Sequence, residues 1–314
     1  MKTIYLSHPH DLNMKDCPQS VMALGFFDGV HRGHQKVILE AKKKAMELGL
    51  ESSVMTFHPH PSAVLRKSIE HVKYITPPKV KEEVVENLGI DRMYVVKFDT
   101  SFAGIEPQQF VDEYIIGLNV KHVVAGFDFS YGRLGRGTME TLPFHARNQF
   151  TQTTIGKVAE GEVKVSSTLI RQCLNEGAVS AAGHYLGRPY MIKGQVVHGE
   201  KRGRSIGFPT ANVEPIDAYI LPPTGVYAVR MKVDDKWYNG VSNIGFKPTF
   251  HDGQKEHPDI EVHLFHFNDS IYGKEVTIEW HKRIRAERKF HSLDDLTAQI
   301  QRDKEETIHF FKGQ

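Results

Sequence analysis

The sequence predicts an α/β plus β architecture, with a doubly wound parallel sheet in the first part of the chain and a small antiparallel β-barrel in the second. Three observations lead to this prediction. Strand and helix patterns alternate up to about residue 185, short strands with glycine and proline turns follow, and one helical pattern closes the chain. A chain of 314 residues is also long enough for two domains. We therefore expect domains at residues 1–185 and 186–314.

In the first part of the chain, short apolar runs alternate with stretches whose apolar residues recur at helical spacing. The expected strands are Val21–Leu24, Ser52–Phe57, Arg92–Phe98 and Val120–Ala125. The expected helices run from Gln35 to a stop at Gly49, from Pro77 to a stop at Gly89, and from Pro107 to about Ile116. Such alternation predicts a parallel sheet with helices on both faces, which binds ligands beyond the carboxyl ends of its strands.

Beyond Gly187 the pattern changes to short strands separated by turns. The expected strands are Tyr190–Val197, Gly225–Val233, Lys236–Val241, Ile260–Phe267 and Lys274–Trp280. Asp234 and Asp235 are a two-residue turn signal between the second and the third of these strands. Ser292 is expected to cap a closing helix. This pattern predicts a small antiparallel barrel with a terminal helix.

The stretch from Gly25 to Gln35, GFFDGVHRGHQ, follows the first strand and opens a helix. It places His31 and His34 three residues apart around Gly33. A helix N-terminus presents free backbone N–H groups and a partial positive charge, which suit a phosphate, and glycines let an anion approach the backbone. We therefore expect an anion site in which two imidazoles stabilise charge during phosphoryl or nucleotidyl transfer. A zinc pair is the weaker alternative, because helical zinc pairs usually lie four residues apart with a third ligand nearby.

A second stretch suits a phosphate in the same way. Ser166, Ser167 and Thr168 open a helix between Lys164 and Arg171. Hydroxyls, free N–H groups and cations at one helix start favour a phosphate site. A single capping hydroxyl would explain one of the serines equally well.

An aromatic segment, GFDFSYG at residues 126–132, follows the strand that begins at Val120. Its aromatic side chains could stack on a planar ring. Core packing beside a glycine turn is the alternative for this segment.

The stretch from Gly199 to Asn212 is rich in glycine and basic residues. It is not a Walker loop, because no Gly-Lys-Ser/Thr follows at the required spacing. It could still close over phosphates, with Thr210 and Asn212 offering oxygens to Mg²⁺. Glu261, in a predicted strand, is the candidate base that takes a hydroxyl proton. A surface loop with scattered charge and a solvent-facing glutamate are the alternatives.

Composition and charge fit a soluble, cytoplasmic protein of the size of an enzyme. Hydrophobic residues make up 40% of the chain and charged residues 25%, as in ordinary globular proteins. The net charge of +2 gives no reason to expect nucleic acid as a partner. Cys17 and Cys173 make no disulfide framework and suit a reducing compartment. We find no signal-peptide core and no apolar run of about 18 residues, so we expect no membrane insertion; protein partners stay open.

Several motifs match one family. The chain contains Gly-x-Phe-Asp-Gly-Val-His-x-Gly-His from Gly25, Ser-Ser-Thr-x-Ile-Arg from Ser166 and Gly-Phe-Pro-Thr-Ala-Asn from Gly207. The segments Asn243-Ile-Gly245, Pro248-Thr249-Phe250 and Glu261-Val-His263-Leu-Phe265 add to the match. Over nearly its whole length the sequence resembles the bacterial bifunctional riboflavin kinases/FMN adenylyltransferases, also called FAD synthetases.

The resemblance implies two ATP-dependent reactions. The C-terminal domain would transfer the γ-phosphate of ATP to riboflavin, giving FMN, with Glu261 as general base and with Thr210 and Asn212 holding Mg²⁺. The N-terminal domain, similar to nucleotidyltransferases of the His-x-Gly-His type, would join FMN to the α-phosphate of a second ATP, giving FAD and pyrophosphate. His31 and His34 would be its catalytic residues.

The resemblance also implies which residues bind the substrates. ATP and phosphate would contact Gly25, Phe27, Asp28, Gly33, Ser167, Thr168, Arg171, Gly203, Gly207, Pro209 and Thr210, and the flavin would contact Asp128 and Phe129. Phe26 and Asp128 stand where many relatives carry asparagine. A kinase with an altered adenylyltransferase half is therefore one alternative, and a flavin- or RNA-binding protein that has kept the fold is another.

Overall fold

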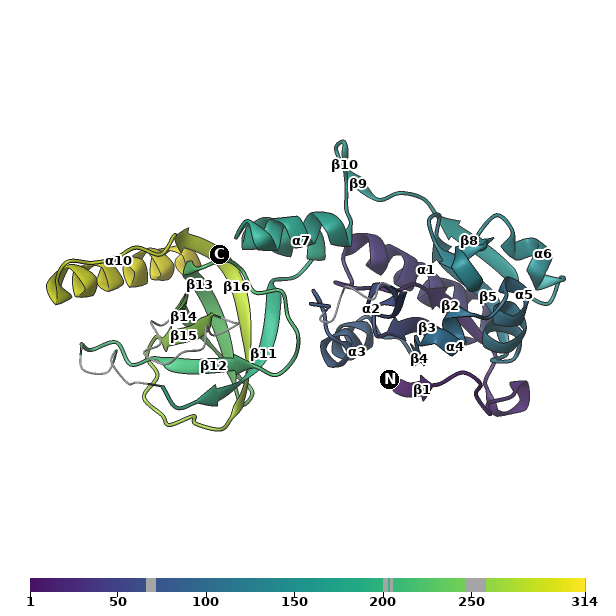
Figure 1. The fold of residues 1–314 in the computed structure, drawn as a ribbon, viewed down its shortest axis with the longest axis horizontal. Helices are drawn as coiled ribbons and strands as arrows, with labels where there is room; N and C mark the ends of the chain where they lie inside the picture. Colours follow the sequence, from purple (N-terminus) through teal and green to yellow (C-terminus); the bar gives the residue numbers. More distant parts are fainter. Residues whose placement is uncertain (66–71, 200–202, 204–205, 247–257, 314) are drawn as a thin grey trace. The chain divides into compact units, whose positions relative to one another are not determined.

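The computed structural model describes residues 1–65, 72–199, 203, 206–246 and 258–313 (Figure 1). The chain groups into two units, Met1–Ser167 and Thr168–Gln314, and each is described by itself. Two groups that the sequence analysis singled out lie outside the described residues: the motif Pro248-Thr249-Phe250, and the basic residues Lys201, Arg202 and Arg204.

A parallel sheet of six strands forms the centre of the first unit, in the order β1-β4-β3-β2-β5-β8. In this order the strands are β1 (Lys2–Leu6), β4 (Arg92–Lys97), β3 (Glu51–His58), β2 (Ser20–Leu24), β5 (Val120–Gly126) and β8 (Thr151–Ile155). β2 is buried along its whole length, as is typical of a parallel strand covered on both faces. The predicted parallel sheet is confirmed.

Helices connect these strands. The helices described in this unit are α1 (Arg32–Leu48), α2 (Pro61–Leu65), α3 (Pro78–Asn87), α4 (Thr100–Ala103), α5 (Pro107–Phe110) and α6 (Leu142–Ala146). Short 3-10 turns occur at η1 (Met14–Asp16) and η3 (Arg133–Gly135). The helix predicted from Pro107 is present in two parts, because α5 continues into the π-helix η2 (Val111–Ile116). α1 packs against β2, β3 and β5 and ends, as predicted, at Gly49, whose φ of 66° lies in the left-handed region.

The two edge strands of the sheet, β1 and β8, were not predicted. Each is only partly buried, so their sequences lack the apolar run that marks the central strands. Two small hairpins complete the unit, β6 (Ser130–Tyr131) with β7 (Gly137–Thr138), and β9 (Ala159–Glu160) with β10 (Val163–Lys164).

A closed antiparallel barrel forms the centre of the second unit, in the order β11-β12-β15-β14-β13-β16. The strands are β11 (Tyr190–Val197), β12 (Ala211–Pro215), β15 (Asp259–Leu264), β14 (Lys236–Gly245), β13 (Gly225–Val233) and β16 (Glu275–Arg285). Large side chains fill it, since Tyr190, Tyr227 and Trp280 are each at most 1% exposed. The ring of Tyr227 meets that of Trp280 edge-on at 5.3 Å. The predicted barrel is confirmed.

Three helices accompany the barrel in the described part of the chain. α7 (Ser167–Asn175) and α8 (Val179–Leu186) precede it, and α10 (Leu293–Lys312) follows it. The hydroxyl of Ser180 on α8 donates to the His281 carbonyl on β16 at 2.5 Å. Ser292 caps α10 as predicted, accepting from the backbone N–H of Asp295.

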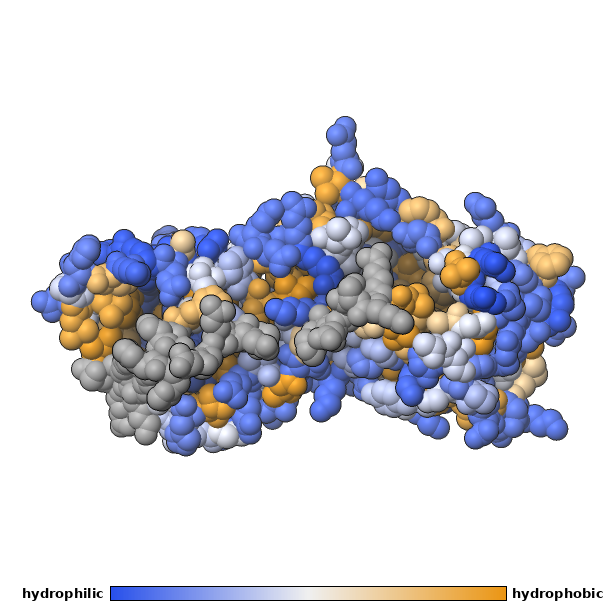
Figure 2. Space-filling view, in the orientation of Figure 1, coloured by the Kyte–Doolittle hydropathy of each residue, from blue (hydrophilic) through white to orange (hydrophobic). Residues whose placement is uncertain are grey.

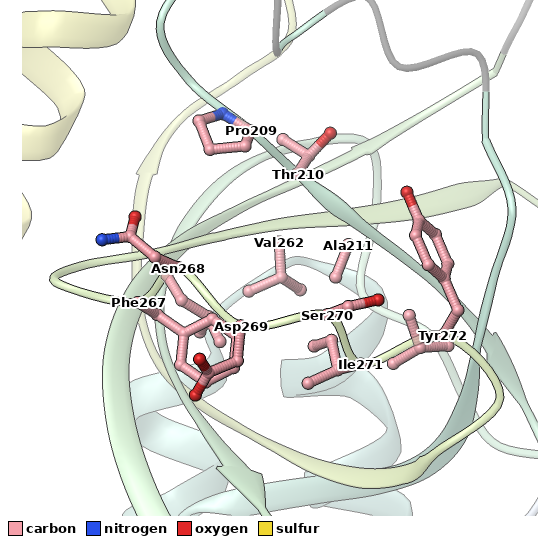
Figure 3. Close-up of a pocket in the computed structure, with 12 residues that line it drawn as sticks. Pro209, Thr210, Ala211, Val262, Phe267, Asn268, Asp269, Ser270, Ile271 and Tyr272 are labelled. Carbon is pink, nitrogen blue, oxygen red and sulfur yellow. The ribbon is translucent and has the colours of Figure 1, made fainter.

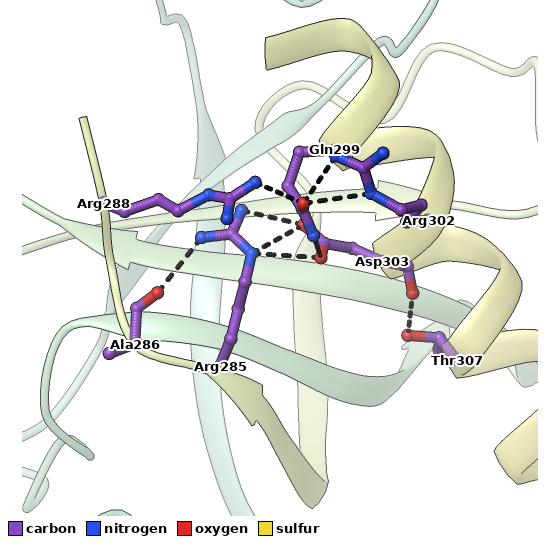
Figure 4. Close-up of polar contacts among 7 residues, drawn as sticks. All are labelled: Arg285, Ala286, Arg288, Gln299, Arg302, Asp303 and Thr307. Atoms are coloured by element: carbon purple, nitrogen blue, oxygen red, sulfur yellow. Dashed lines mark hydrogen bonds and ion pairs between the residues drawn. The ribbon is translucent and has the colours of Figure 1, made fainter. Parts of the chain in front are cut away.

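A buried ion pair fastens α10 to the barrel (Figure 4). The Arg285 guanidinium, at the end of β16, donates to both carboxylate oxygens of Asp303 at 3.0 and 2.8 Å. Asp303 is 3% exposed and also accepts from Gln299 at 2.7 Å. Because a buried carboxylate is stable only with partners, this cluster sets where the helix lies on β16.

The face of the molecule in Figure 2 is mostly hydrophilic, with apolar side chains in separate patches, which is usual for a globular protein. Among the described residues no helix combines the length and the apolar character needed to cross a membrane.

Candidate active sites

The turn between β2 and α1 brings two imidazole rings together. His31 is the N-cap of α1, and its Nδ1 accepts a hydrogen bond from the backbone N–H of His34 at 3.2 Å. The two rings are stacked, with centroids 3.5 Å apart and planes at 18°. β2 lies between β3 and β5, where the strand order reverses, and open parallel sheets bind ligands at that point. The pair therefore lies at a helix N-terminus on the ligand-binding edge of the sheet.

The backbone of this turn is unusual. Phe27 has a φ of 53° and Val30 a φ of 43°, in the left-handed region that a β-branched residue rarely adopts. A Cβ on Gly25 would lie 2.6 Å from the Phe27 ring, and a Cβ on Gly33 would lie 3.0 Å from the His31 ring. The turn thus needs glycine at both positions, and strain of this kind gathers at functional sites.

His34 is held in an environment that disfavours its charged form. Burial, together with the nearby charges of His31 and Lys81, holds the pKa of His34 well below its usual value. The Phe27 ring meets the His34 ring edge-on at 5.3 Å. Nδ1 of His34 is buried and has no hydrogen-bond partner among the described residues. A neutral imidazole with an unpaired nitrogen is suited to exchange hydrogen bonds with a substrate.

Asp28 lies in the turn, and its carboxylate is hydrogen-bonded to the protein backbone. Its carboxylate is 2% exposed and accepts from the backbone N–H groups of Ile75 at 3.1 Å and Thr76 at 3.0 Å. Its own carbonyl accepts from the Ser167 hydroxyl at 2.8 Å. The structure thus brings Ser167 to the turn.

Thr168 and Arg171 follow Ser167 on α7. They belong to the second unit, so their place beside the histidines stays a prediction.

Lys81 is a residue of this site that the sequence analysis missed. It is 3% exposed, and its Nζ donates to the Phe26 carbonyl at 2.8 Å and to the Thr56 hydroxyl at 3.1 Å. The signal was present, because Lys81 lies with Val80 and Val84 on the buried face of α3, where a lysine is rare.

The predicted flavin residues lie after β5. Asp128 makes an ion pair with Lys164 at 2.8 Å, and the Lys164 ammonium also lies 5.0 Å from the centroid of the Phe127 ring. Phe129 is partly buried and packs against the core of the unit. Phe127 is 49% exposed, so an aromatic face is available beside a paired cation and carboxylate. Contact of Asp128 and Phe129 with flavin stays a prediction.

In the second unit, strand register assembles another polar group. Asn212 on β12 and Asn243 on β14 both lie directly opposite Glu261 on β15. Residues opposite one another in antiparallel strands share a face of the sheet. The amides and the carboxylate therefore form one row across three strands, although they are up to 49 residues apart in sequence.

The segment before β12 packs against the same face. The Thr210 hydroxyl donates to Oε2 of Glu261 at 3.4 Å. The Pro209 carbonyl lies 2.9 Å from Nδ1 of His263, a side chain that is 7% exposed and whose pKa is lowered by burial. The sequence analysis gave His263 no role. It anchors the backbone that carries Thr210.

The glycines of this segment allow close packing. A Cβ on Gly199 would lie 2.1 Å from the Asn212 amide, and a Cβ on Gly203 would lie 2.3 Å from the Phe208 carbonyl oxygen. Gly207 has a φ of 84°, which a residue with a side chain rarely adopts. Gly199 and Gly203 therefore leave no room for a side chain beside Asn212 and Phe208.

A pocket of about 450 Å³ lies beside Thr210 (Figure 3). Figure 3 shows Ala211 and Val262, from neighbouring strands, facing Ser270 and Ile271 across it. Successive residues of a strand point to opposite faces, so this pocket and Glu261 lie on opposite faces of β15. Thr210 touches both.

The donor set near Glu261 suits a hard cation. Among the described residues no three His, Cys, Asp or Glu side chains gather as a metal cluster. The Thr210 hydroxyl, the Asn212 amide and the Glu261 carboxylate offer oxygens only, and these are the ligands that Mg²⁺ prefers together with substrate phosphates. The residues present therefore fit Mg²⁺ better than zinc.

Family models match both parts of the chain. A model described as FAD synthetase matches residues 13–169, and one described as riboflavin kinase matches residues 186–311.

Proteins named bifunctional riboflavin kinase/FMN adenylyltransferase match the whole chain. The protein from Bacillus subtilis is 55% identical and covers 100% of this chain and 99% of its own length. That from Listeria monocytogenes is 47% identical over 99% of this chain and 98% of its own. Among solved structures, the crystal structure of a macrolide-efflux protein from Streptococcus pneumoniae has a TM-score of 0.88 and 35% identity, covering 98% of this chain and 99% of that chain.

The N-terminal part of the chain thus matches an FAD synthetase and the C-terminal part a riboflavin kinase, and the relatives that match the whole chain are named for both activities. The protein phosphorylates riboflavin to FMN and adenylylates FMN to FAD, with ATP as the second substrate of each step. The chain belongs to the family of bifunctional riboflavin kinases/FMN adenylyltransferases.

Proposed function

We propose that the two reactions occur at two separate sites, adenylyl transfer at the turn between β2 and α1 and riboflavin phosphorylation at the row that contains Glu261. The observation that carries the first assignment is the stacked pair of His31 and His34 at the N-terminus of α1. The observation that carries the second is the strand register that sets Asn212 opposite Glu261.

In adenylyl transfer, an oxygen of the FMN phosphate attacks the α-phosphorus of ATP. The bond from that phosphorus to the bridging oxygen breaks, and pyrophosphate leaves with the electron pair. The chain offers no nucleophile of its own here, so catalysis rests on positioning and on charge stabilisation. His31, His34 and backbone N–H groups at the start of α1 would donate to the phosphate oxygens, whose negative charge the helix N-terminus favours.

The remaining predicted residues support this site. Gly25, Phe27 and Gly33 shape the turn. The Asp28 carboxylate ties the turn to the segment before α3 by accepting from the backbone N–H groups of Ile75 and Thr76. Ser167, Thr168 and Arg171 would bind the leaving pyrophosphate, and Asp128 and Phe129 would contact the flavin.

In riboflavin phosphorylation, the Glu261 carboxylate takes the proton of the riboflavin 5′-hydroxyl while that oxygen attacks the γ-phosphorus of ATP. The bond from that phosphorus to the oxygen that bridges it to the β-phosphate breaks, and ADP leaves with the electron pair. Thr210 and Asn212 would hold Mg²⁺, which when bound neutralises charge on the ATP phosphates. Gly203, Gly207 and Pro209 place the backbone against those phosphates. The pocket beside Thr210 takes the nucleoside of ATP, since its volume lies in the range of small-molecule sites.

We also propose a boundary between the domains at residues 185 and 186. The riboflavin kinase match begins at residue 186 and the first barrel strand at Tyr190, although α7 and α8 group with the barrel. A cytoplasmic location fits the free thiols of Cys17 and Cys173, and a net charge of +2 gives no reason to include nucleic acid among the partners.

A product assay tests the assignment. The purified protein is given ATP with riboflavin or with FMN, in Mg²⁺ or in a chelator, and the flavins are separated by chromatography. We expect FMN and then FAD from riboflavin, FAD from FMN, and no FMN from riboflavin in the chelator. FMN formation that is unchanged without divalent metal would contradict the role given to Thr210 and Asn212.

A further inference from the structure

A buried lysine stands behind the turn that carries the histidines. Lys81 on α3 has its Nζ 2.8 Å from the Phe26 carbonyl and 3.1 Å from Oγ1 of Thr56. That hydroxyl itself donates to the same carbonyl at 2.7 Å, and the Nζ lies 4.6 Å from the centroid of the Phe26 ring. Lys81 and Thr56 are 3% and 1% exposed. Two donors, the Lys81 ammonium and the Thr56 hydroxyl, thus meet at one backbone oxygen of the turn.

Burying the charged Lys81 side chain costs more free energy than a hydrogen bond with a purely structural role requires. An ammonium group has three donors, and the two acceptors described for it are both uncharged. Burial lowers the pKa of Lys81 to about 8, with the charge of Asp28 opposing that effect. The side chain is therefore still mostly charged at neutral pH. A neutral donor could hold a carbonyl without the cost of burying a charge, so the charge itself needs a reason.

The position of α3 supplies one. The segment that leads into α3 donates from Ile75 and Thr76 to the carboxylate of Asp28, while Lys81 within α3 donates to the carbonyl of Phe26. The turn is thus held on both sides of Phe27, a residue whose φ of 53° has to be maintained against backbone strain. Lys81 also acts on His34, whose proton affinity its charge lowers.

We propose that Lys81 is a positioning residue for adenylyl transfer, whose ammonium fixes the Phe26 carbonyl and so maintains the turn that presents His31 and His34 to the phosphates. This inference rests on the proposed assignment of the turn as the adenylyl-transfer site. It assigns Lys81 no contact with substrate.

The test uses the full-length enzyme, because riboflavin phosphorylation reports on the other site of the same chain. In Lys81→Met, we expect kcat for FAD formation from FMN to fall by about 100-fold, since small misplacement of catalytic groups has effects of that size. The KM values for FMN and ATP should change much less, because the loss falls on the transition state. FMN formation from riboflavin should be unchanged. Lys81→Arg, which keeps the charge and the donors, should restore most of the FAD activity.

A matched control separates positioning from folding. Lys42 is a partly buried lysine of the same unit whose Nζ donates to the Leu88 carbonyl at 2.9 Å, away from the histidines. Lys42→Met should leave both reactions unchanged. If Lys81→Met does not fold, Thr56→Val, which removes one of the two acceptors, should still lower FAD formation selectively.

Three results would overturn the proposal: FAD formation that survives Lys81→Met, an equal loss in Lys42→Met, or a failure of Lys81→Arg to recover activity. His34→Ala is measured beside them. If His34→Ala abolishes FAD formation and Lys81→Met does not, the positioning role alone is wrong. If neither variant affects FAD formation, the assignment of the turn is wrong as well.

Discussion

The turn after β2 and the barrel face around Glu261, the two places to which we assign the two reactions, are built in different ways. At the turn, His31 and His34 lie three residues apart in one chain segment, and their geometry depends on local backbone strain. On the barrel, Asn212, Asn243 and Glu261 come from three strands, and only the strand register brings them together. The first site is therefore sensitive to whatever supports one turn, and the second to the alignment of a whole sheet.

The two sites also hold charge differently. The turn is backed by a buried cation, Lys81, and carries an imidazole, His34, that burial keeps neutral. The barrel face carries a partly buried carboxylate, Glu261, near a hydroxyl and amides. Donors suit the charge of a transferring phosphate, whereas a carboxylate suits a hydroxyl proton. The difference in residue types thus follows the difference between the reactions.

The largest expected effect is on the barrel site. Glu261→Gln keeps the size of the side chain but cannot take a proton, so FMN formation from riboflavin should fall by about 1000-fold. FAD formation from added FMN should stay at the level of the unmodified protein. Chromatography of both reactions measures this. Substantial FMN formation by Glu261→Gln would contradict the role of Glu261 as the general base.

The next effect is on the turn. His31→Ala or His34→Ala removes a donor to the transferring phosphate, which should lower FAD formation from FMN by about 100-fold or more. FMN formation from riboflavin should be unchanged, since the barrel does not depend on either imidazole. The rate of pyrophosphate release measures FAD formation directly. A parallel loss of FMN formation in a folded variant would contradict separate sites.

A smaller effect concerns the cation. Asn212→Ala removes one of the oxygens proposed to hold Mg²⁺, and we expect the Mg²⁺ concentration needed for half-maximal FMN formation to rise about tenfold. The Mg²⁺ dependence of FAD formation should not move, which serves as the control. An unchanged Mg²⁺ concentration for half-maximal FMN formation would contradict the proposal that Asn212 binds the metal.

Stability should separate the two units. Asp303→Asn leaves the Arg285 guanidinium without its buried counter-ion, and breaking such a pair costs about 3–5 kcal/mol. Calorimetry should show a lower melting temperature for the barrel unit alone. The exposed pair of Lys282 and Glu306, at 2.9 Å, is the matched control, and Glu306→Gln should cost less than about 1 kcal/mol. Equal losses in the two variants would mean that the buried pair contributes no more than a surface pair.

The smallest effect is a pH dependence of the first unit. Burial and the charges of His31 and Lys81 hold the pKa of His34 below 6.5 in the folded state. As pH falls below 6.5 the unfolded chain binds that proton first, so stability should decrease with falling pH until the lowered pKa is passed. Imidazole ¹⁵N NMR should show a neutral His34 ring at pH 6. A His34 ring that titrates near 6.5 would contradict this environment.

The sequence predicted the turn well because its residues are contiguous. The geometry of Gly25 to His34 can be predicted from the segment itself, because the glycine spacing, the strand before it and the helix after it are all visible in one stretch of sequence. The same holds for Gly49 and Ser292, which end and begin helices as predicted. Local signals of this kind need no knowledge of the rest of the fold.

Contacts across the fold were not predictable in this way. No strand was predicted at β12, and β14 was expected to end at Val241, before Asn243. The register that aligns Asn212 with Glu261 was therefore invisible. Lys81 was missed for the same reason, because its partners, Phe26 and Thr56, lie 55 and 25 residues away.

The central claim is that the two reactions occur at two separate sites of the chain, and mixing two variants tests it most directly. His34→Ala and Glu261→Gln are each given riboflavin, ATP and Mg²⁺, alone and as an equimolar mixture, and FAD is measured over many turnovers. The account predicts that neither variant alone makes appreciable FAD and that the mixture does, because FMN released by the first is adenylylated by the second. FAD in the mixture no higher than in the separate variants would contradict it.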